Sequence, residues 1–232
     1  MSLKEDFSAV AGISASQGRS GYGRFTAIAA AALICVILAM VSLWPMQAAV
    51  FNQEGGLFET VSAAALLAAG LAALWRYPGL SRLYIGLVCL LLAERELEAD
   101  IYQTDSLPYW ILNGLDTVLD ITLVRAALAL IVVGGVVWHG IPNAWRAFKD
   151  KAPFLLIFFL AGCAAVVAQG LEEVAGVLHD SLSATMLMRL FVLEETLEMF
   201  FSIGILAAVL IGWPKSEIKE TSNDPELRPN LR

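Results

Sequence analysis

Long apolar stretches separated by short polar connections dominate this chain. They occupy residues 25–44, 57–75, 81–97, 117–138, 153–170 and 190–213. Each approaches the roughly 20 residues that a helix needs to cross a bilayer about 30 Å thick. Helix is the expected structure because lipid offers the backbone no hydrogen-bond partners, and no alternating pattern of barrel strands is visible. The pattern predicts an all-α bundle of six transmembrane helices.

Composition supports a membrane location. Hydrophobic residues make up 58% of the chain and charged residues only 16%, which lies outside the usual range of soluble domains. We therefore expect a multi-pass protein of the cell membrane, with the lipid bilayer as its surroundings. The formal net charge of -7 gives no reason to expect a nucleic-acid partner.

Basic residues are sorted to alternate connections between the apolar stretches. Twelve of the fifteen lie before the first stretch, between the second and third, between the fourth and fifth, and after the sixth: Lys4, Arg19, Arg24, Arg76, Arg82, Arg146, Lys149, Lys151, Lys215, Lys219, Arg228 and Arg232. The exceptions are Arg95 and Arg189 at helix edges and Arg125 inside the fourth stretch. Cytoplasmic connections carry the excess of Lys and Arg in membrane proteins. Both termini are therefore predicted to be cytoplasmic.

The chain divides into three parts. Residues 1–24 form a polar segment with a Ser- and Gly-rich end, and residues 214–232 form a polar tail with no apolar period. Such compositions favour mobile segments. We predict a mobile cytoplasmic N-terminal segment over 1–24, a six-helix membrane domain over 25–213 and a mobile cytoplasmic tail over 214–232.

Acidic residues gather at the opposite end of the apolar stretches from the basic ones. They are Glu59, Glu94, Glu96, Glu98, Asp116, Asp120, Glu172, Glu173, Glu194, Glu195 and Glu198. A carboxylate inside lipid costs roughly 2.5–3.5 kcal/mol at a helix centre, so such groups usually face a bundle interior or a wet cavity. The layer predicts an acidic site in the outer half of the membrane.

Helical spacing groups these acids into faces. Pairs four residues apart recur in the third, fourth and sixth stretches, as in Glu94 with Glu98 and Asp116 with Asp120. Like charges at this spacing repel unless they are protonated, paired with Arg or bridged by a cation. The candidate cation-binding residues are Glu59, Glu94, Glu98, Asp120, Glu195 and Glu198, and the candidate counter-charges are Arg95, Arg125 and Arg189. On a continuous helix Arg125 would lie off the Asp120 face, so we expect its acidic partner on another helix.

Three functions fit this pattern. The first is binding, with transport as its extension, of a cation or a proton-coupled solute; oxygen ligands suit Ca²⁺, Mg²⁺ or Mn²⁺, and buried carboxylates can also relay protons. The second is a membrane accessory or assembly protein in which acids and arginines only fix the helix register. The third, a metal-dependent membrane enzyme, is weakened because neither His139 nor His179 follows a Glu at the Glu-x-x-His spacing of di-iron bundles.

Small residues in several stretches favour close helix packing. Examples are Ser62, Ala63, Gly70 and Ala73 in the second stretch. Such faces let backbones approach one another in membranes. They suit a compact bundle and would equally suit a homo-oligomer, which stays open as a partner.

Overall fold

The computed structural model describes residues 28–52, 55–77, 79, 82–97 and 99–212, and this part of the chain is all-helical, with no strand. The helices in chain order are Ile28–Leu43, α2 (Pro45–Ala48), η1 (Ala49–Phe51), α3 (Leu57–Arg76), α4 (Leu83–Arg95), η3 (Ala99–Ile101), α5 (Leu107–Leu119), α6 (Thr122–Gly135), the π-helix η4 (Val136–Gly140), α7 (Ile141–Lys149), α8 (Pro153–Leu178) and α9 (Ala184–Ile211). The predicted segments 1–24 and 214–232 and the side chain of Glu98 lie outside the described residues.

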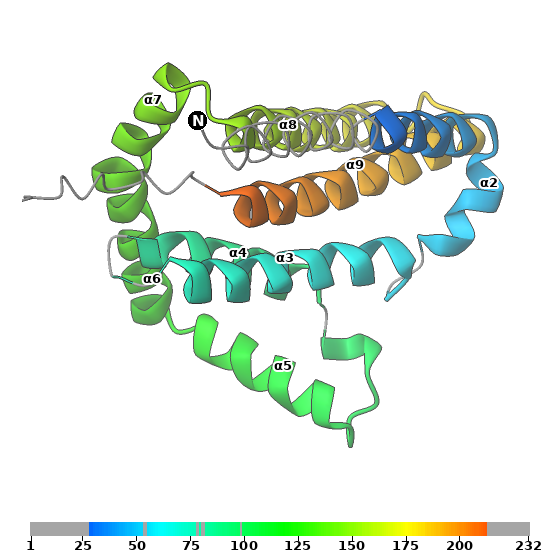
Figure 1. Cartoon of the computed structure of the whole chain (residues 1–232). Coiled ribbons are helices and arrows are strands. Elements are labelled where there is room, and N and C mark those ends of the chain that lie inside the picture. The colour runs from blue at the N-terminus through cyan, green and yellow to red at the C-terminus, as the bar shows by residue number, and fades with distance from the viewer. Residues whose placement is uncertain (1–27, 53–54, 78, 80–81, 98, 213–232) are drawn as a thin grey trace, which may run out of the picture.

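Four helices form the centre of the molecule. The most extensive contacts join α8 to α9, and further contacts join α3 to both α4 and α9. In Figure 1 these helices run roughly side by side, with α9 between α8 and the α3–α4 pair. The short α8–α9 connection makes that pair antiparallel, as does the α3–α4 connection.

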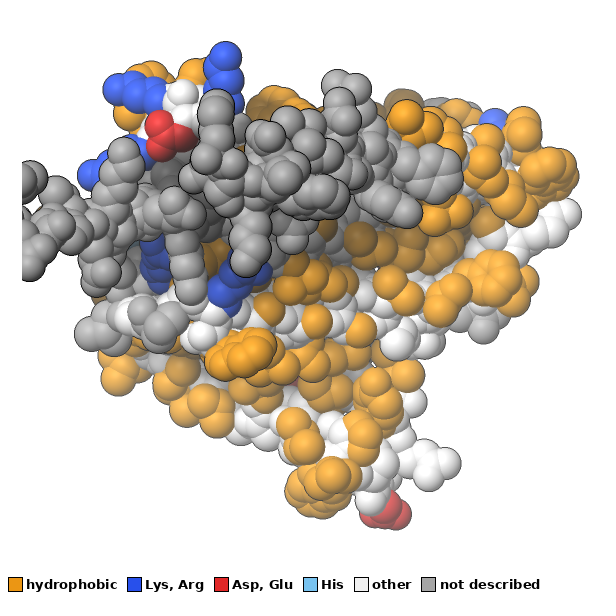
Figure 2. Space-filling model, in the orientation of Figure 1, with side chains coloured by type: hydrophobic (Ala, Val, Ile, Leu, Met, Phe, Trp, Pro, Cys, Tyr) orange, Lys and Arg blue, Asp and Glu red, His pale blue; other side chains and the backbone are white. Residues whose placement is uncertain are grey.

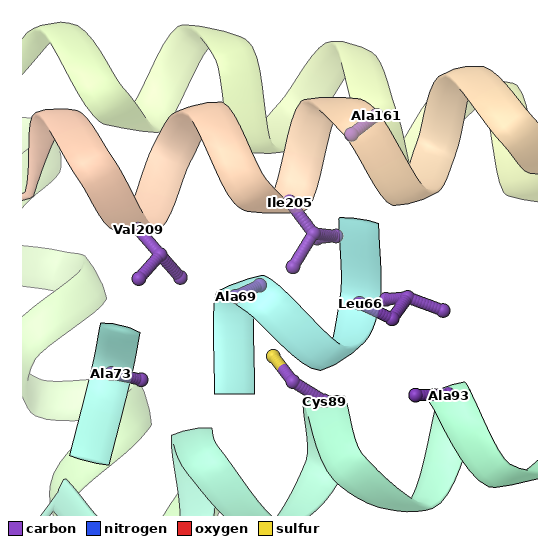
Figure 3. Packing of buried hydrophobic residues seen from close by; sticks show 8 residues of the cluster. All are labelled: Leu66, Ala69, Ala73, Cys89, Ala93, Ala161, Ile205 and Val209. Carbon is purple, nitrogen blue, oxygen red and sulfur yellow. The ribbon is translucent and has the colours of Figure 1, made fainter. Parts of the chain in front are cut away.

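The core between these helices is built mainly from small residues. It contains Leu66, Ala69, Ala73, Cys89, Ala93, Ala161, Ile205 and Val209, which Figure 3 shows projecting between α3, α4, α8 and α9. A side chain added at Gly70 or Gly86 would meet the facing helix, at 2.9 Å from Leu90 or 2.5 Å from Leu74. The two glycines therefore allow α3 and α4 to approach closely, as small residues do in membrane bundles.

A sharp bend follows the first helix. Ile28–Leu43 and the segment Pro45–Phe51 meet at 106°. Proline has no backbone N–H and its ring clashes with the preceding helical turn, so Pro45 ends one helix and begins the next. The bend brings α2 against α9, where Val41, Phe58, Val192 and Met199 form a second buried cluster.

Three helical stretches are long and apolar enough to cross a membrane. They are Leu57–Arg76, Thr122–Lys149 and Pro153–Leu178, and a fourth arises if the bent pair at the N-terminal side counts as one span. Two of them are mostly exposed: no residue is buried in the most apolar window of Thr122–Lys149 and 11% are buried in that of Pro153–Leu178, against 44% in Leu57–Arg76. Exposed apolar surface of this extent suits contact with lipid, and Figure 2 shows it over much of one face. The structure thus indicates a helical membrane protein.

The longest exposed stretch differs in direction from the central helices. The segments α6, η4 and α7 continue one another as a single rod, and Figure 1 shows this rod running across the direction of α3, α8 and α9. Its contacts with the rest are few: α6 with α4 and α5, and α7 with α8. Tyr84 of α4 fits against the rod at Gly135 and Gly140, where an added side chain would lie 2.5 Å and 3.1 Å from Tyr84 atoms.

Two connections expected from the apolar pattern are largely taken up by helix. The predicted outer connection before residue 117 contains α5, which begins with Ser106 as N-cap and Pro108 in its first turn. The predicted stretch 117–138 is broken, because Ile121 is extended between α5 and α6. Helices α8 and α9 are longer than expected and leave only residues 179–183 as their connection.

Candidate functional site

The predicted carboxylates lie in two places. Glu94 and Asp120 line a cleft between α4, α5 and α6, which we call the α4–α6 cleft. Glu59, Glu195 and Glu198 belong to a second set around α9, which we call the α9 acid group and which also includes Glu96, Glu172 and Glu194. The remaining candidate ligand, Glu98, is outside the described residues.

The α4–α6 cleft combines charged side chains with apolar walls. Its volume is about 520 Å³. Its charged residues are Glu94, Arg95, Asp116, Asp120 and Arg125, and its apolar residues are Val88, Leu91, Leu92, Leu119, Leu128, Ala129 and Val132. A cavity of this size is within the range of small-molecule sites, roughly 300–1,000 Å³.

Two acids meet directly in this cleft. The side chains of Glu94 and Asp116 lie close to each other, and Asp120 and Arg125 also act on Glu94 electrostatically. Two neighbouring carboxyl groups repel each other when both are ionised, so a proton or a positive group must stabilise the pair. The arrangement can therefore take up positive charge.

Arg125 holds the junction between α5 and α6. Its Nη2 atom lies 2.7 Å from Oδ1 of Asp120, and its Nε donates to the Leu119 carbonyl oxygen at 3.1 Å. The pair forms because the chain turns at Ile121, so Asp120 ends one helix while Arg125 belongs to the next. The expectation that Arg125 would pair with an acid other than Asp120 is therefore wrong, because the break at Ile121 brings these two residues, five apart in sequence, into contact. The side chains of Arg125 and Asp120 are mostly exposed, at 68% and 79% respectively.

The α9 acid group surrounds the middle of α9. Glu195 interacts electrostatically with Glu198, Glu59, Glu194 and Glu96. Arg95 brings positive charge to this group, since it acts on both Glu96 and Glu198. Since Arg95 also lines the α4–α6 cleft, it lies between the two sets of acids.

Glu59 has a local structural role as well. Its Oε2 atom accepts a hydrogen bond of 2.8 Å from the Gly55 backbone N–H, just before α3 begins at Leu57. Helix N-termini leave backbone N–H groups without partners, and an acid in the first turn is also favoured by the helix dipole. Glu59 therefore stabilises the start of α3 whether or not it binds a ligand.

Two predicted counter-charges, Arg95 and Arg189, have no ion pair with any carboxylate of the described residues. Within the described residues the ion pairs are Asp120–Arg125 and His179–Asp180. Arg189 has a contact of 4.0 Å with the Met186 sulfur, and its buried Nε atom has no hydrogen-bond partner. Over the same ranges, no group of three or more His, Cys, Asp or Glu side chains is placed to hold a metal ion.

Four acids that were not chosen as candidates take part in these groups: Asp116 in the cleft, and Glu96, Glu172 and Glu194 around α9. Asp116 lies close to Glu94, and its position four residues before Asp120 was the available signal. Glu96 interacts with the Ser62 hydroxyl, which itself hydrogen-bonds Ser202 of α9. Glu96 belongs to the acidic layer of the sequence, but helical spacing gave no direction for its side chain, because it follows the end of α4 in a turn.

No protein-family model, curated protein or solved structure matches this chain.

Proposed function

We propose that this chain is an integral membrane protein that binds a small cationic solute in the α4–α6 cleft. The observation that carries the proposal is the lining of the cleft: three carboxyl groups, Glu94, Asp116 and Asp120, beside apolar residues of α4 and α6. Such a surface complements a molecule with a positive group and an apolar body. Transport of the solute would be an extension of this binding.

The balance of charge favours a cation over an anion. Three carboxyl groups face two guanidinium groups, Arg95 and Arg125. Arg125 already pairs with Asp120, so the Glu94–Asp116 pair is the part of the lining with surplus negative charge. An amine placed between these two acids would relieve their repulsion, as would a shared proton. The same pair could therefore couple solute binding to protonation.

The proposed topology is six membrane spans with both termini cytoplasmic. It is supported by the sorting of charge: Arg76, Arg82 and Lys149 belong to connections at one end of the helices, and the acids lie toward the other. The rod of α6 and α7 runs across the central helices in Figure 1, so this topology requires the rod to tilt when the bundle lies in a bilayer. In the alternative, the rod lies along the membrane surface and the spans are fewer.

A binding measurement tests the proposed function. Purified protein in detergent is titrated with benzylamine, and benzyl alcohol serves as a neutral probe of similar shape, with calorimetry as the readout. We expect benzylamine to bind more tightly, and Glu94→Gln to weaken it by about tenfold, equivalent to roughly 1.4 kcal/mol. Glu173→Gln is the matched control, because Glu173 is exposed on α8 and does not line the cleft.

The outcome separates the proposal from its alternatives. Equal binding of benzylamine and benzyl alcohol would refute a cation site. Binding of Ca²⁺, Mg²⁺ or Mn²⁺ that Glu94→Gln abolishes would point instead to the metal-ion form of the hypothesis.

An accessory or assembly role is the second candidate function. Two of the predicted cation-binding residues already have partners within the protein, which favours this role: Asp120 pairs with Arg125, and Glu59 accepts a hydrogen bond from Gly55. If neither benzylamine nor a divalent cation binds, while Asp120→Asn lowers the unfolding temperature, this reading would replace the first. Capture of a membrane partner by the intact protein would then be the next measurement.

A further inference from the structure

One side of α7 exposes an apolar stripe. Trp138 of η4 and Ile141, Trp145 and Phe148 of α7 are all exposed, with exposed fractions from 58% to 79%. Their spacing of three, four and three residues places them along one helical face. Ala147, on another side of the helix, is fully buried, and α7 contacts α8. The helix is therefore anchored to the protein and directs its aromatic stripe outward.

Basic side chains border this stripe. Lys149 places its Nζ atom 5.4 Å from the centre of the Trp145 ring, and the Trp145 and Phe148 rings stack with centroids 6.1 Å apart. Arg146 and Lys151 are also exposed, whereas Asp150 contributes the one acid of this stretch. Figure 2 shows Lys and Arg side chains gathered with apolar ones at the end of the molecule that α7 forms in Figure 1.

The length of the rod places α7 at the edge of a bilayer. Thr122–Lys149 has 28 residues, which makes a helix about 42 Å long at 1.5 Å per residue, whereas the hydrocarbon layer is about 30 Å thick. The apolar residues of α6 and η4 fill that layer, so α7 extends into the headgroups. If the rod instead lies along the surface, the aromatic stripe of α7 reaches the same headgroup level. Aromatic rings with basic residues beside them are typical of that level.

We propose that α7 is a binding site for anionic phospholipids. Arg146 and Lys149 bind the lipid phosphate groups, while Trp138, Trp145 and Phe148 enter the boundary of the acyl chains. The occupant is argued from charge: three basic residues and one acid lie within 146–151, and anionic headgroups supply the opposite charge. The Lys149 ammonium group lies over the Trp145 ring, so the positive charge sits at the border of the aromatic stripe.

Fluorescence quenching by brominated lipids tests this site on the full chain. Protein in mixed micelles is titrated with brominated phosphatidylglycerol or brominated phosphatidylcholine, and the Trp145 contribution is taken as the difference from Trp145→Phe. We expect brominated phosphatidylglycerol to quench at lower lipid fraction, because each basic residue near an anionic surface contributes on the order of fivefold in affinity. The variant Arg146→Gln/Lys149→Gln should lose at least about fivefold of this preference, and salt should reduce it in the unchanged protein.

Two further variants keep the result interpretable. Arg146→Lys/Lys149→Arg retains the charge and should retain the preference, and Lys215→Gln/Lys219→Gln removes the same charge from the tail and should also retain it. An equal preference in Arg146→Gln/Lys149→Gln and in the unchanged protein would overturn the proposal. So would a Trp145 signal that neither brominated lipid quenches, because the stripe would then be covered by protein, for example by a second copy of this chain. Benzylamine binding depends on Glu94 and not on α7, so a failure here leaves the cleft proposal standing.

Discussion

The hydroxyl oxygen of Ser62 lies 2.6 Å from that of Ser202, and this hydrogen bond joins α3 to α9 inside the bundle. Both side chains are fully buried. Ser202 also bonds the Glu198 carbonyl oxygen of its own helix at 3.0 Å. A buried hydroxyl without a partner is costly, so the pair favours one register of α3 against α9. That register is the one that sets Glu59 near Glu195.

Loss of either serine hydroxyl should destabilise the contact between α3 and α9. We expect Ser202→Ala to lower the free energy of unfolding by about 1–2 kcal/mol, because Ser62 loses its partner across the helices. The double variant Ser62→Ala/Ser202→Ala should cost less than the sum of the two single ones. Thermal unfolding in detergent measures this, with Ser42→Ala as control, since Ser42 bonds only the Leu38 carbonyl of its own helix. Additive effects would show that the two hydroxyls do not interact.

The α8–α9 contact depends on the absence of a side chain at Gly204. A methyl group there would lie 2.7 Å from the Cβ atom of Ala161. Gly204→Ala should therefore push the helices apart and destabilise the protein by about 1–3 kcal/mol, even though alanine is the better helix former. Gly162→Ala is the matched control, since an added methyl meets nothing within 4 Å, and it should leave stability unchanged or slightly raised. If the two variants unfold at the same temperature, the packing argument fails.

Long apolar periodicity predicted part of the fold well. The helical class is confirmed, and the stretch 57–75 corresponds closely to α3, Leu57–Arg76. The small residues Ser62, Ala63, Gly70 and Ala73 are buried in the core as that pattern predicts. Local sequence carries this information because lipid requires helix and close packing requires small side chains.

The points at which helices break, and the directions in which they then run, could not be predicted in the same way. Residues 117–138 are mostly apolar, with Asp120 and Arg125 as the charged exceptions, but the backbone turns at Ile121 and redirects α6 away from α5. Helical spacing along one continuous helix therefore misjudged the geometry between Asp120 and Arg125. Whether acids from different helices meet also depends on how the helices cross. Glu94 lies beside Asp116 and not in the α9 acid group. The reason is that the C-terminal end of α4, which holds Glu94, faces α5 in the α4–α6 cleft.

Arg125 should weaken cation binding in the α4–α6 cleft. Its guanidinium group lies among the cleft acids and repels a positive ligand. We expect Arg125→Gln to raise the affinity for benzylamine by roughly three- to tenfold, for an interaction that solvent partly screens. Stability should change little, by about 1 kcal/mol or less, because the ion pair with Asp120 is exposed. Arg146→Gln makes the same charge change on α7, outside the cleft, and should leave benzylamine affinity unaltered; a similar gain there would show a non-specific charge effect.

The proposed topology makes opposite predictions for two connections. Ser181 lies between α8 and α9 at the acidic end, and Lys151 lies between α7 and α8 at the basic end. In a background with Cys35, Cys89 and Cys163 changed to Ala, Ser181→Cys should react with a membrane-impermeant maleimide in intact cells. Lys151→Cys should react only after the cells are opened, because basic connections stay cytoplasmic. Asn143→Cys in α7 tests the rod: labelling only after the cells are opened would fit α7 at the cytoplasmic headgroups, whereas protection from both sides would place this part of α7 in the hydrocarbon layer or against protein. Labelling of Lys151→Cys from outside would reverse the orientation, and with it the assignment of the acid layer to the outer half.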